Sequence, residues 1–248
     1  MPGSRVGVDV GVRVLATVAS PDGEVVQRVP NPRPFEATLK ELRHLSRERS
    51  RRTRGSRRYL ETQQKITRLQ RRIACIRGHH LHTLTTRLAK THGEVVVEGL
   101  DVAGMLRQKG LPGARARRRG LSDAALGETR RQLAYKTGWY GSRLIVASRW
   151  YPSSKTCHAC GHVQDIGWAE HWTCTGCGAG HQRDDNAAIN LARYEPPVAG
   201  DSAVGPVRAA VKRRADRKTG PRPAGGEEAR KGPSRDAGKQ PRDGVPTR

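Results

Sequence analysis

The chain has 248 residues, enough for one medium-sized domain or for one domain with appendages. Its 47 Lys and Arg residues against 23 Asp and Glu give a formal net charge of +24. Such a charge destabilises a compact protein unless a polyanion neutralises it, so a nucleic acid is the expected partner. No apolar run approaches the roughly 18–20 residues that span a bilayer, so we expect a cytoplasmic, nucleoid-associated protein without a membrane partner.

The N-terminal residues predict β-strands. Residues 5–19 alternate between apolar and small or polar side chains with a period of two, which is typical of a β-hairpin. Gly11 is suited to its tight turn, and Asp9 lies near the end of its first strand. A turn at 20–23 (Ser-Pro-Asp-Gly) leads into a third predicted strand over 24–29.

Residues 36–92 have the pattern of two long helices. Apolar side chains recur at helical spacing in both, at Leu39, Leu42 and Leu45 and then at Ile66, Leu69, Ile73, Ile76, Leu84 and Leu88. Between the helices, residues 49–58 hold six arginines, and residues 36–87 hold 15 Lys and Arg against 4 Glu. Because a guanidinium group can bind two phosphate oxygens at once, this basic helical hairpin is a candidate nucleic-acid interface.

A β-branched run at 94–100 (EVVVEGL) predicts a buried central strand that ends on Glu98. Burying a carboxylate at that position without a cation would be costly. Glu98 is therefore the acidic residue whose position most strongly suggests a functional role.

The segment that follows is strongly basic. Residues 107–120 (RQKGLPGARARRRG) have the composition of a mobile loop. Ser122 is a candidate cap for a helix over about 123–138, and residues 142–150 predict a further strand. A final helix is expected from about 185 to 194.

Four of the five cysteines form two CxxC pairs separated by thirteen residues: Cys157, Cys160, Cys174 and Cys177. This spacing brings four thiolates around one tetrahedral Zn²⁺, as in zinc ribbons, and four protein ligands make the zinc structural. Gly161 and Gly178 allow turns that direct backbone N–H groups at sulfur. His158 and His181 can replace a thiolate, but we expect both to be bystanders. Cys75 lies at an apolar position of a helical pattern and is expected to be buried.

Three acidic residues stand at positions from which a sheet and a docked helix can bring them into one cleft. They are Asp9 in the first strand, Glu98 at the end of a buried strand, and Asp184 at the start of the last helix. Mg²⁺ and Mn²⁺ prefer oxygen ligands, and two such ions catalyse phosphodiester hydrolysis in many nucleases. Spacing alone does not choose between Asp184 and Asp185, which is also a candidate helix cap.

Residues 196–248 contain 8 Pro and 8 Gly and no aromatic residue. A segment of this composition cannot bury enough apolar surface to offset the entropy lost on ordering, so a disordered basic tail is expected.

Four motifs together resemble the TnpB (OrfB) family of accessory transposases from small bacterial insertion sequences. The first, second and third RuvC motifs are matched by Val6–Gly11, Val95–Leu100 and Arg183–Asn190, and the entry to the zinc ribbon by Pro152–Gly161. The resemblance implies an α/β, RNase H-like (RuvC) domain with an inserted helical hairpin and a zinc ribbon. In these terms, 1–156 and 181–195 form the nuclease domain, 36–92 the hairpin and 157–180 the ribbon.

The resemblance also implies a function. It assigns the catalytic role to Asp9, Glu98 and Asp184, favouring Asp184 over Asp185, with Mg²⁺ or Mn²⁺ as catalytic ions. The family cleaves DNA with a guide RNA derived from the transposon end, next to a short target-adjacent motif. The basic hairpin and the 107–120 segment would then line a nucleic-acid channel or gate the site.

Two alternatives accompany this hypothesis. Family members carry a substantial region before the first RuvC strand, whereas four residues precede it here, so we expect a fragment or a natural remnant. The first alternative is a catalytically inactive remnant that binds DNA or RNA. The second is an unstable remnant with no function. A transposase that joins strands through a tyrosine is disfavoured, because Tyr135 and Tyr140 have no paired His motif nearby.

Overall fold

A computed structural model describes residues 4–108 and 113–196 of the chain. In chain order its elements are β1 (Arg5–Val10), β2 (Val14–Ala19), β3 (Val25–Pro30), α1 (Pro34–Ser50), α2 (Arg57–Thr91), β4 (Glu94–Glu98), α3 (Val102–Arg107), α4 (Ala114–Ala124), α5 (Leu126–Tyr140), β5 (Arg143–Ala147), β6 (His171–Thr173), β7 (Gly180–Gln182) and α6 (Arg183–Ala192). The predicted disordered tail lies outside the described residues apart from its first residue. None of the described helices is long and apolar enough to cross a membrane.

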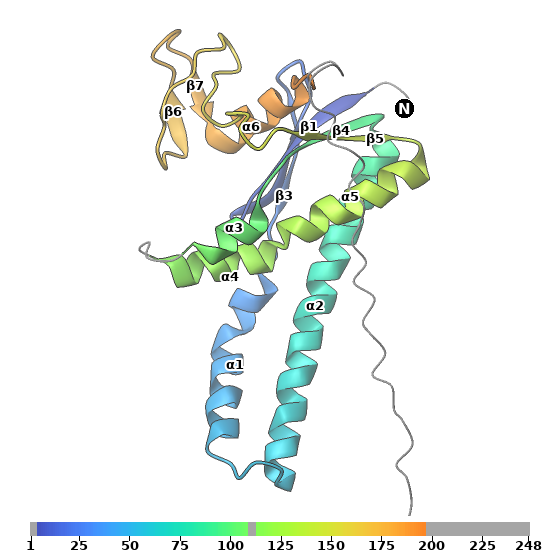
Figure 1. Ribbon diagram of the computed structural model, residues 1–248, viewed down its shortest axis with the longest axis vertical. Helices are drawn as coiled ribbons and strands as arrows, with labels where there is room; N and C mark the ends of the chain where they lie inside the picture. The colour runs from blue at the N-terminus through green and yellow to red at the C-terminus, as the bar shows by residue number, and fades with distance from the viewer. Residues whose placement is uncertain (1–3, 109–112, 197–248) are drawn as a thin grey trace, which may run out of the picture. The chain divides into compact units, whose positions relative to one another are not determined.

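The fold is a mixed α/β fold built on a five-stranded sheet of order β3-β2-β1-β4-β5 (Figure 1). Strand β1 pairs antiparallel with β2 and parallel with β4, and β4 pairs parallel with β5. The strands predicted at 5–19, 24–29, 94–100 and 142–150 all form. Because β1, β4 and β5 are parallel, their carboxyl ends meet at one edge of the sheet.

Each face of the central strands is covered by helices, and the alternation of valines in β4 shows how. Val95 and Val97 face a core shared with Leu84 and Leu88 of α2 and Leu133 of α5. Val96 between them points to the opposite face, where it packs with Leu191 of α6. Burial on both faces explains why β4 is a continuous apolar run rather than an alternating one.

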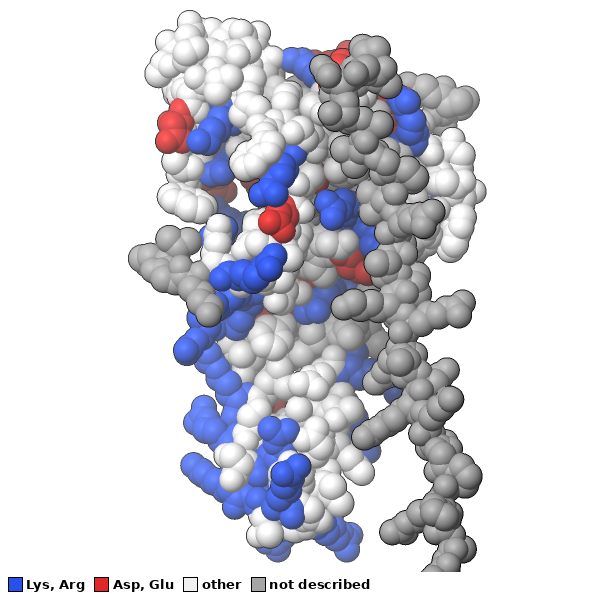
Figure 2. All heavy atoms as spheres, viewed as in Figure 1, with Lys and Arg blue, Asp and Glu red and all other residues white. Residues whose placement is uncertain are grey.

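Helices α1 and α2, which lie between β3 and β4 in the chain, pack against each other as a hairpin. Its own small core consists of Leu42, Leu45, Ile66, Leu69 and Ile73. At the tip, the side chains of Arg49 and Arg52 turn inward to bond Gln63 and Thr62. The tip arginines that remain exposed are Arg51, Arg54, Arg57 and Arg58. Lys and Arg side chains gather over this part of the protein in Figure 2.

The structure corrects the prediction for the segment before α5. Residues 114–120, expected to belong to a loop, form the first part of α4, and residues 109–112 lie outside the description. Ser122 is inside α4 and caps nothing; α5 begins instead after Ala125, which has a left-handed conformation with φ of 49°. Alanine and arginine are strong helix formers, and this propensity outweighs the basic composition that suggested a loop.

The prediction for Cys75 is also wrong, because its side chain is exposed. Ile73, two residues earlier, belongs to the hairpin core. Two residues correspond to about 200° around an α-helix, so Cys75 faces away from that core.

Candidate functional site

The carboxyl ends of β1 and β4 bring Asp9 and Glu98 next to each other. Val8 pairs with Val97 in the parallel register, and Asp9 and Glu98 are the next residues of the two strands. The side chains of Val8 and Val97 point into the core beneath α2 and α5. Since side chains alternate along a strand, Asp9 and Glu98 point to the other face, which α6 covers.

Helix α6 reaches this site because it lies directly on β1. A Cβ atom on Gly7 would be 2.1 Å from the Ala188 carbonyl oxygen and 2.2 Å from the Ala192 nitrogen. Only a glycine permits this approach of helix to strand. The amino end of α6 then presents Asp184 to the same edge of the sheet.

The pKa of Asp9 shows that its carboxyl group lies close enough to Asp184 and Glu98 to respond to their charges. Burial raises the pKa of Asp9 to about 8, and the charges of Asp184 and Glu98 add to the rise. Burial also raises the pKa of Glu98 and that of Asp184, while the Arg183 guanidinium opposes both rises. A hard divalent cation bound by the three carboxylates would relieve their repulsion and their desolvation.

Asp185 has a different environment from its neighbour Asp184. Its carboxylate accepts hydrogen bonds from Nε and Nη2 of Arg28, at 3.0 and 2.5 Å. It is not the helix cap either, because the cap of α6 is Gln182, whose Oε1 accepts from the Asp185 backbone N–H at 2.7 Å. Asp185 thus pairs with Arg28 of β3. Asp184 is the acid whose charge raises the pKa of Asp9.

The four cysteines converge as the spacing predicted. Their sulfur atoms all lie within 4.8 Å of one another, and the Cys157–Cys177 and Cys160–Cys174 sulfur pairs are 3.7 and 3.6 Å apart. Four sulfurs at ~2.3 Å from a tetrahedral Zn²⁺ would be about 3.8 Å apart, so the cluster fits one metal ion.

The turns of the two cysteine loops depend on glycine, as expected. Gly161 and Gly178 adopt φ of 77° and 74°. Their N–H groups, however, donate to the carbonyl oxygens of Cys157 and Cys174 rather than to sulfur. Other backbone groups of these turns reach sulfur, among them the Gly176 N–H, 3.3 Å from Cys174 Sγ.

As expected, neither His158 nor His181 belongs to the group of candidate metal ligands among the described residues, but both make contacts at the first cysteine loop. His181 is buried, and its Nε2 lies 3.0 Å from Cys157 Sγ, so it can orient that thiolate. The His158 ring stacks edge-on against His181, with ring centroids 4.6 Å apart. The His158 backbone N–H donates to Asn186 Oδ1 at 3.0 Å, and this bond joins the first cysteine loop to α6.

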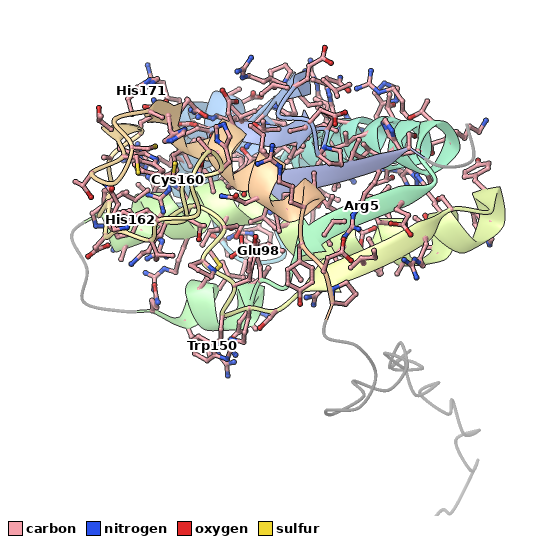
Figure 3. All side chains as sticks on the ribbon, turned by 90° about the horizontal axis from the view of Figure 1, so that it is seen from above. Arg5, Glu98, Trp150, Cys160, His162 and His171 are labelled. Carbon is pink, nitrogen blue, oxygen red and sulfur yellow. The ribbon has the colours of Figure 1, made fainter. Side chains whose placement is uncertain are left out.

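Two buried asparagines of α6, missed by the sequence analysis, connect the cysteine cluster to the carboxylates. Asn186 Nδ2 donates to the carbonyl oxygens of Ser153 and Thr156 at 3.2 and 2.7 Å. Asn190, one turn later, donates to the same two oxygens at 2.8 and 2.6 Å. Their signal in the sequence is a pair of amides four residues apart in an otherwise alanine-rich helix, since buried amides need partners. In Figure 3 Cys160 and His162 mark the first cysteine loop, and Glu98 lies toward the opposite end of the paired strands from Arg5.

Comparison with known proteins agrees with this architecture. Residues 1–109 match the OrfB_IS605 family model, described as "Probable transposase". Residues 127–191 match the model of the Cas12f1-like TNB domain. The two matched segments contain all three acids and all four clustered cysteines between them. The chain belongs to the TnpB/OrfB family.

Relatives and solved structures extend the comparison. A Mycobacterium tuberculosis (strain H37Rv) protein named "Putative RNA-guided DNA endonuclease" is 71% identical over 245 residues, which are 99% of this chain and 53% of that protein. A Streptomyces pristinaespiralis protein of the same name is 38% identical over 76% of this chain and 44% of its own length. The chain thus spans about half the length of such relatives. The fold resembles that in a CRISPR-Cas12f ternary complex, with a TM-score of 0.58 and 22% identity over 77% of this chain and 39% of that one.

Proposed function

We propose that this chain is an RNase H-like (RuvC) nuclease module with a zinc ribbon, acting in RNA-guided, metal-dependent cleavage of DNA. The observation that carries the proposal is the placement of Asp9, Glu98 and Asp184 at one edge of the sheet, where burial raises all three pKa values and the charges of Asp184 and Glu98 add to the rise at Asp9. The nuclease module would comprise 1–156 and 181–195, and the ribbon 157–180. The names of the relatives and the family support this assignment.

The three carboxylates would hold Mg²⁺ or Mn²⁺ through oxygen, the ligand that these ions prefer. Such ions supply an activated water and neutralise charge on the attacked phosphodiester. Glu98 and Asp9 come from the rigid sheet and Asp184 from a helix docked on it, so their geometry is fixed before substrate arrives. Arg183, next to Asp184, adds a positive charge that can attract the phosphate.

The exposed arginines at the hairpin tip and along its faces would grip the backbones of target DNA and of a guide RNA from the transposon end. Such contacts are electrostatic and weaken steeply with salt. Sequence choice would come from base pairing between guide and target, as in RNA-guided nucleases generally.

The cleavage experiment uses single- and double-stranded DNA in Mg²⁺, with and without transposon-end RNA. Asp184→Ala is compared with Asp185→Ala, an adjacent acid whose partner is Arg28. We expect Asp184→Ala to reduce cleavage by roughly 10³-fold or more, as loss of a catalytic group does. Asp185→Ala should keep most of the activity. DNA binding without cleavage by the unmodified chain would favour the catalytically inactive remnant instead.

We propose that the four-cysteine cluster holds a structural Zn²⁺ and that Asn186 transmits its effect to α6. Asn186→Ala leaves the His158 N–H without its partner, at roughly 1–3 kcal/mol for a group left unsatisfied. The Ser153 and Thr156 carbonyls lose one of their two amide donors and keep Asn190. We expect Asn186→Ala to release zinc to a chromogenic chelator roughly tenfold faster than the unmodified protein does. Asn31→Ala is the control, because Asn31 also bonds backbone groups but lies far from the ribbon in the sequence. Equal zinc release from all three proteins would contradict this role.

A further inference from the structure

Two tryptophans are largely exposed, and an arginine side chain lies near each ring. Trp150 is 80% and Trp168 84% exposed. The Arg149 guanidinium carbon lies 4.7 Å from the Trp150 ring centroid, and that of Arg117 lies 5.9 Å from the Trp168 ring. Exposing two large aromatic rings costs hydrophobic free energy, so packing within the described protein gives no reason for them.

Trp150 is anchored beside Glu98. Ala147, the last residue of β5, pairs directly with Glu98 in the parallel register. The residues after β5 lie close to Gly99, which follows Glu98. A Cβ atom on Gly99 would be 2.5 Å from the Ala147 carbonyl oxygen and 3.3 Å from the Arg149 nitrogen. Figure 3 shows Trp150 projecting outward from this turn.

Trp168 is anchored beside Asp184, from the ribbon side. The Arg183 Nη1 group donates to the Gly167 carbonyl oxygen at 3.1 Å. Gly167 directly precedes Trp168, and Arg183 directly precedes Asp184. The two exposed rings therefore belong to segments held against the neighbours of two of the acids, Gly99 after Glu98 and Arg183 before Asp184.

We propose that Trp150 and Trp168 are positioning residues that stack bases of a single DNA strand on either side of the carboxylate cluster. An aromatic face accepts any base, and Arg149 and Arg117 supply charge for the neighbouring phosphates. Bases held on both sides would draw the strand between them across the three acids. The strand has to be single because bases in a duplex are stacked on one another. This inference rests on the proposed nuclease function for its substrate, but its test is a binding measurement.

The experiment compares the unmodified protein, Trp150→Ala/Trp168→Ala and Trp139→Ala in binding two labelled oligonucleotides, without added Mg²⁺ and at one salt concentration. One probe is oligothymidylate and the other is an abasic strand of the same length and charge. Trp139 is the matched control, being 72% exposed and preceding β5, at the amino end of the parallel strands.

We expect the double variant to bind oligothymidylate roughly 10–100-fold more weakly, as loss of one or two stacked bases implies, and the abasic strand unchanged. Trp139→Ala should bind both probes like the unmodified protein. Trp150→Phe/Trp168→Phe should recover most of the affinity, which a merely structural defect would not allow. Unchanged oligothymidylate binding by the double variant, or an equal loss for both probes, would overturn the inference. Neither result depends on whether the protein cleaves DNA.

Discussion

Gly7→Ala is expected to abolish the proposed metal-dependent cleavage and to destabilise the protein by about 3 kcal/mol or more, the upper range of overpacking costs. The added methyl group would meet the Ala188 carbonyl oxygen at 2.1 Å and the Ala192 nitrogen at 2.2 Å. Both are backbone atoms of α6, so no side-chain rotation relieves the clash. The helix must move away from β1, and Asp184 moves with it. Chemical denaturation and a DNA cleavage assay together measure the two effects.

Gly138→Ala is the matched control for that substitution. Gly138 lies in α5, and a Cβ atom there meets nothing within 4 Å. Alanine in an exposed helical position should stabilise the protein by up to about 1 kcal/mol. If Gly7→Ala were as stable and as active as Gly138→Ala, the direct packing of α6 on β1 would be wrong.

Asp9→Asn is expected to remove activity while raising the stability of the protein prepared without Mg²⁺ or Mn²⁺. In the folded protein the pKa of Asp9 is raised from 3.8 to about 8. A carboxyl group with a raised pKa destabilises the folded state at pH values above that pKa, and the penalty shrinks as pH falls toward the unfolded value. The unmodified protein should therefore gain stability as pH is lowered from 9 to 7. The variant should lack this gain.

The measurement is the free energy of unfolding at pH 9 and pH 7, with Asp22→Asn as control. Asp22 is an exposed residue of the turn before β3 and is not one of the three acids Asp9, Glu98 and Asp184. It should leave both the stability and its pH dependence unchanged. A protein in which Asp9→Asn lowers stability at pH 9 would show that the carboxylate is already compensated by another partner.

Much of the scaffold could be predicted because its signals are local. The valines of β4, the period-two pattern of β1 and the two CxxC pairs each determine a structure from neighbouring residues. Residues 114–120 were mispredicted since arginine fits both a loop and a helix, and the choice depends on packing. The exposure of Cys75 depends on which face of α2 meets α1, which a single helical stripe leaves undetermined.

The connections between distant segments could not be predicted. Gly7 and Ala188 belong to motifs that are each recognisable, but their 2.1 Å approach appears only when the helix is placed on the strand. The bonds of Asn186 to Ser153 and Thr156 likewise join segments about 30 residues apart. Asp184 and Asp185 are adjacent, and their spacing in the sequence does not distinguish them. The ion pair between Arg28 and Asp185 does, because it gives Asp185 a separate partner.

The central claim is that Asp9, Glu98 and Asp184 form one divalent-cation site. The most direct measurement is Mn²⁺ binding by titration calorimetry, with the cysteine cluster saturated with zinc beforehand. We predict that the unmodified protein binds Mn²⁺, that Asp9→Asn, Glu98→Gln and Asp184→Asn each abolish or strongly weaken binding, and that Asp185→Asn retains it. Mn²⁺ binding that survives all three substitutions, or that is lost only in Asp185→Asn, would contradict the account.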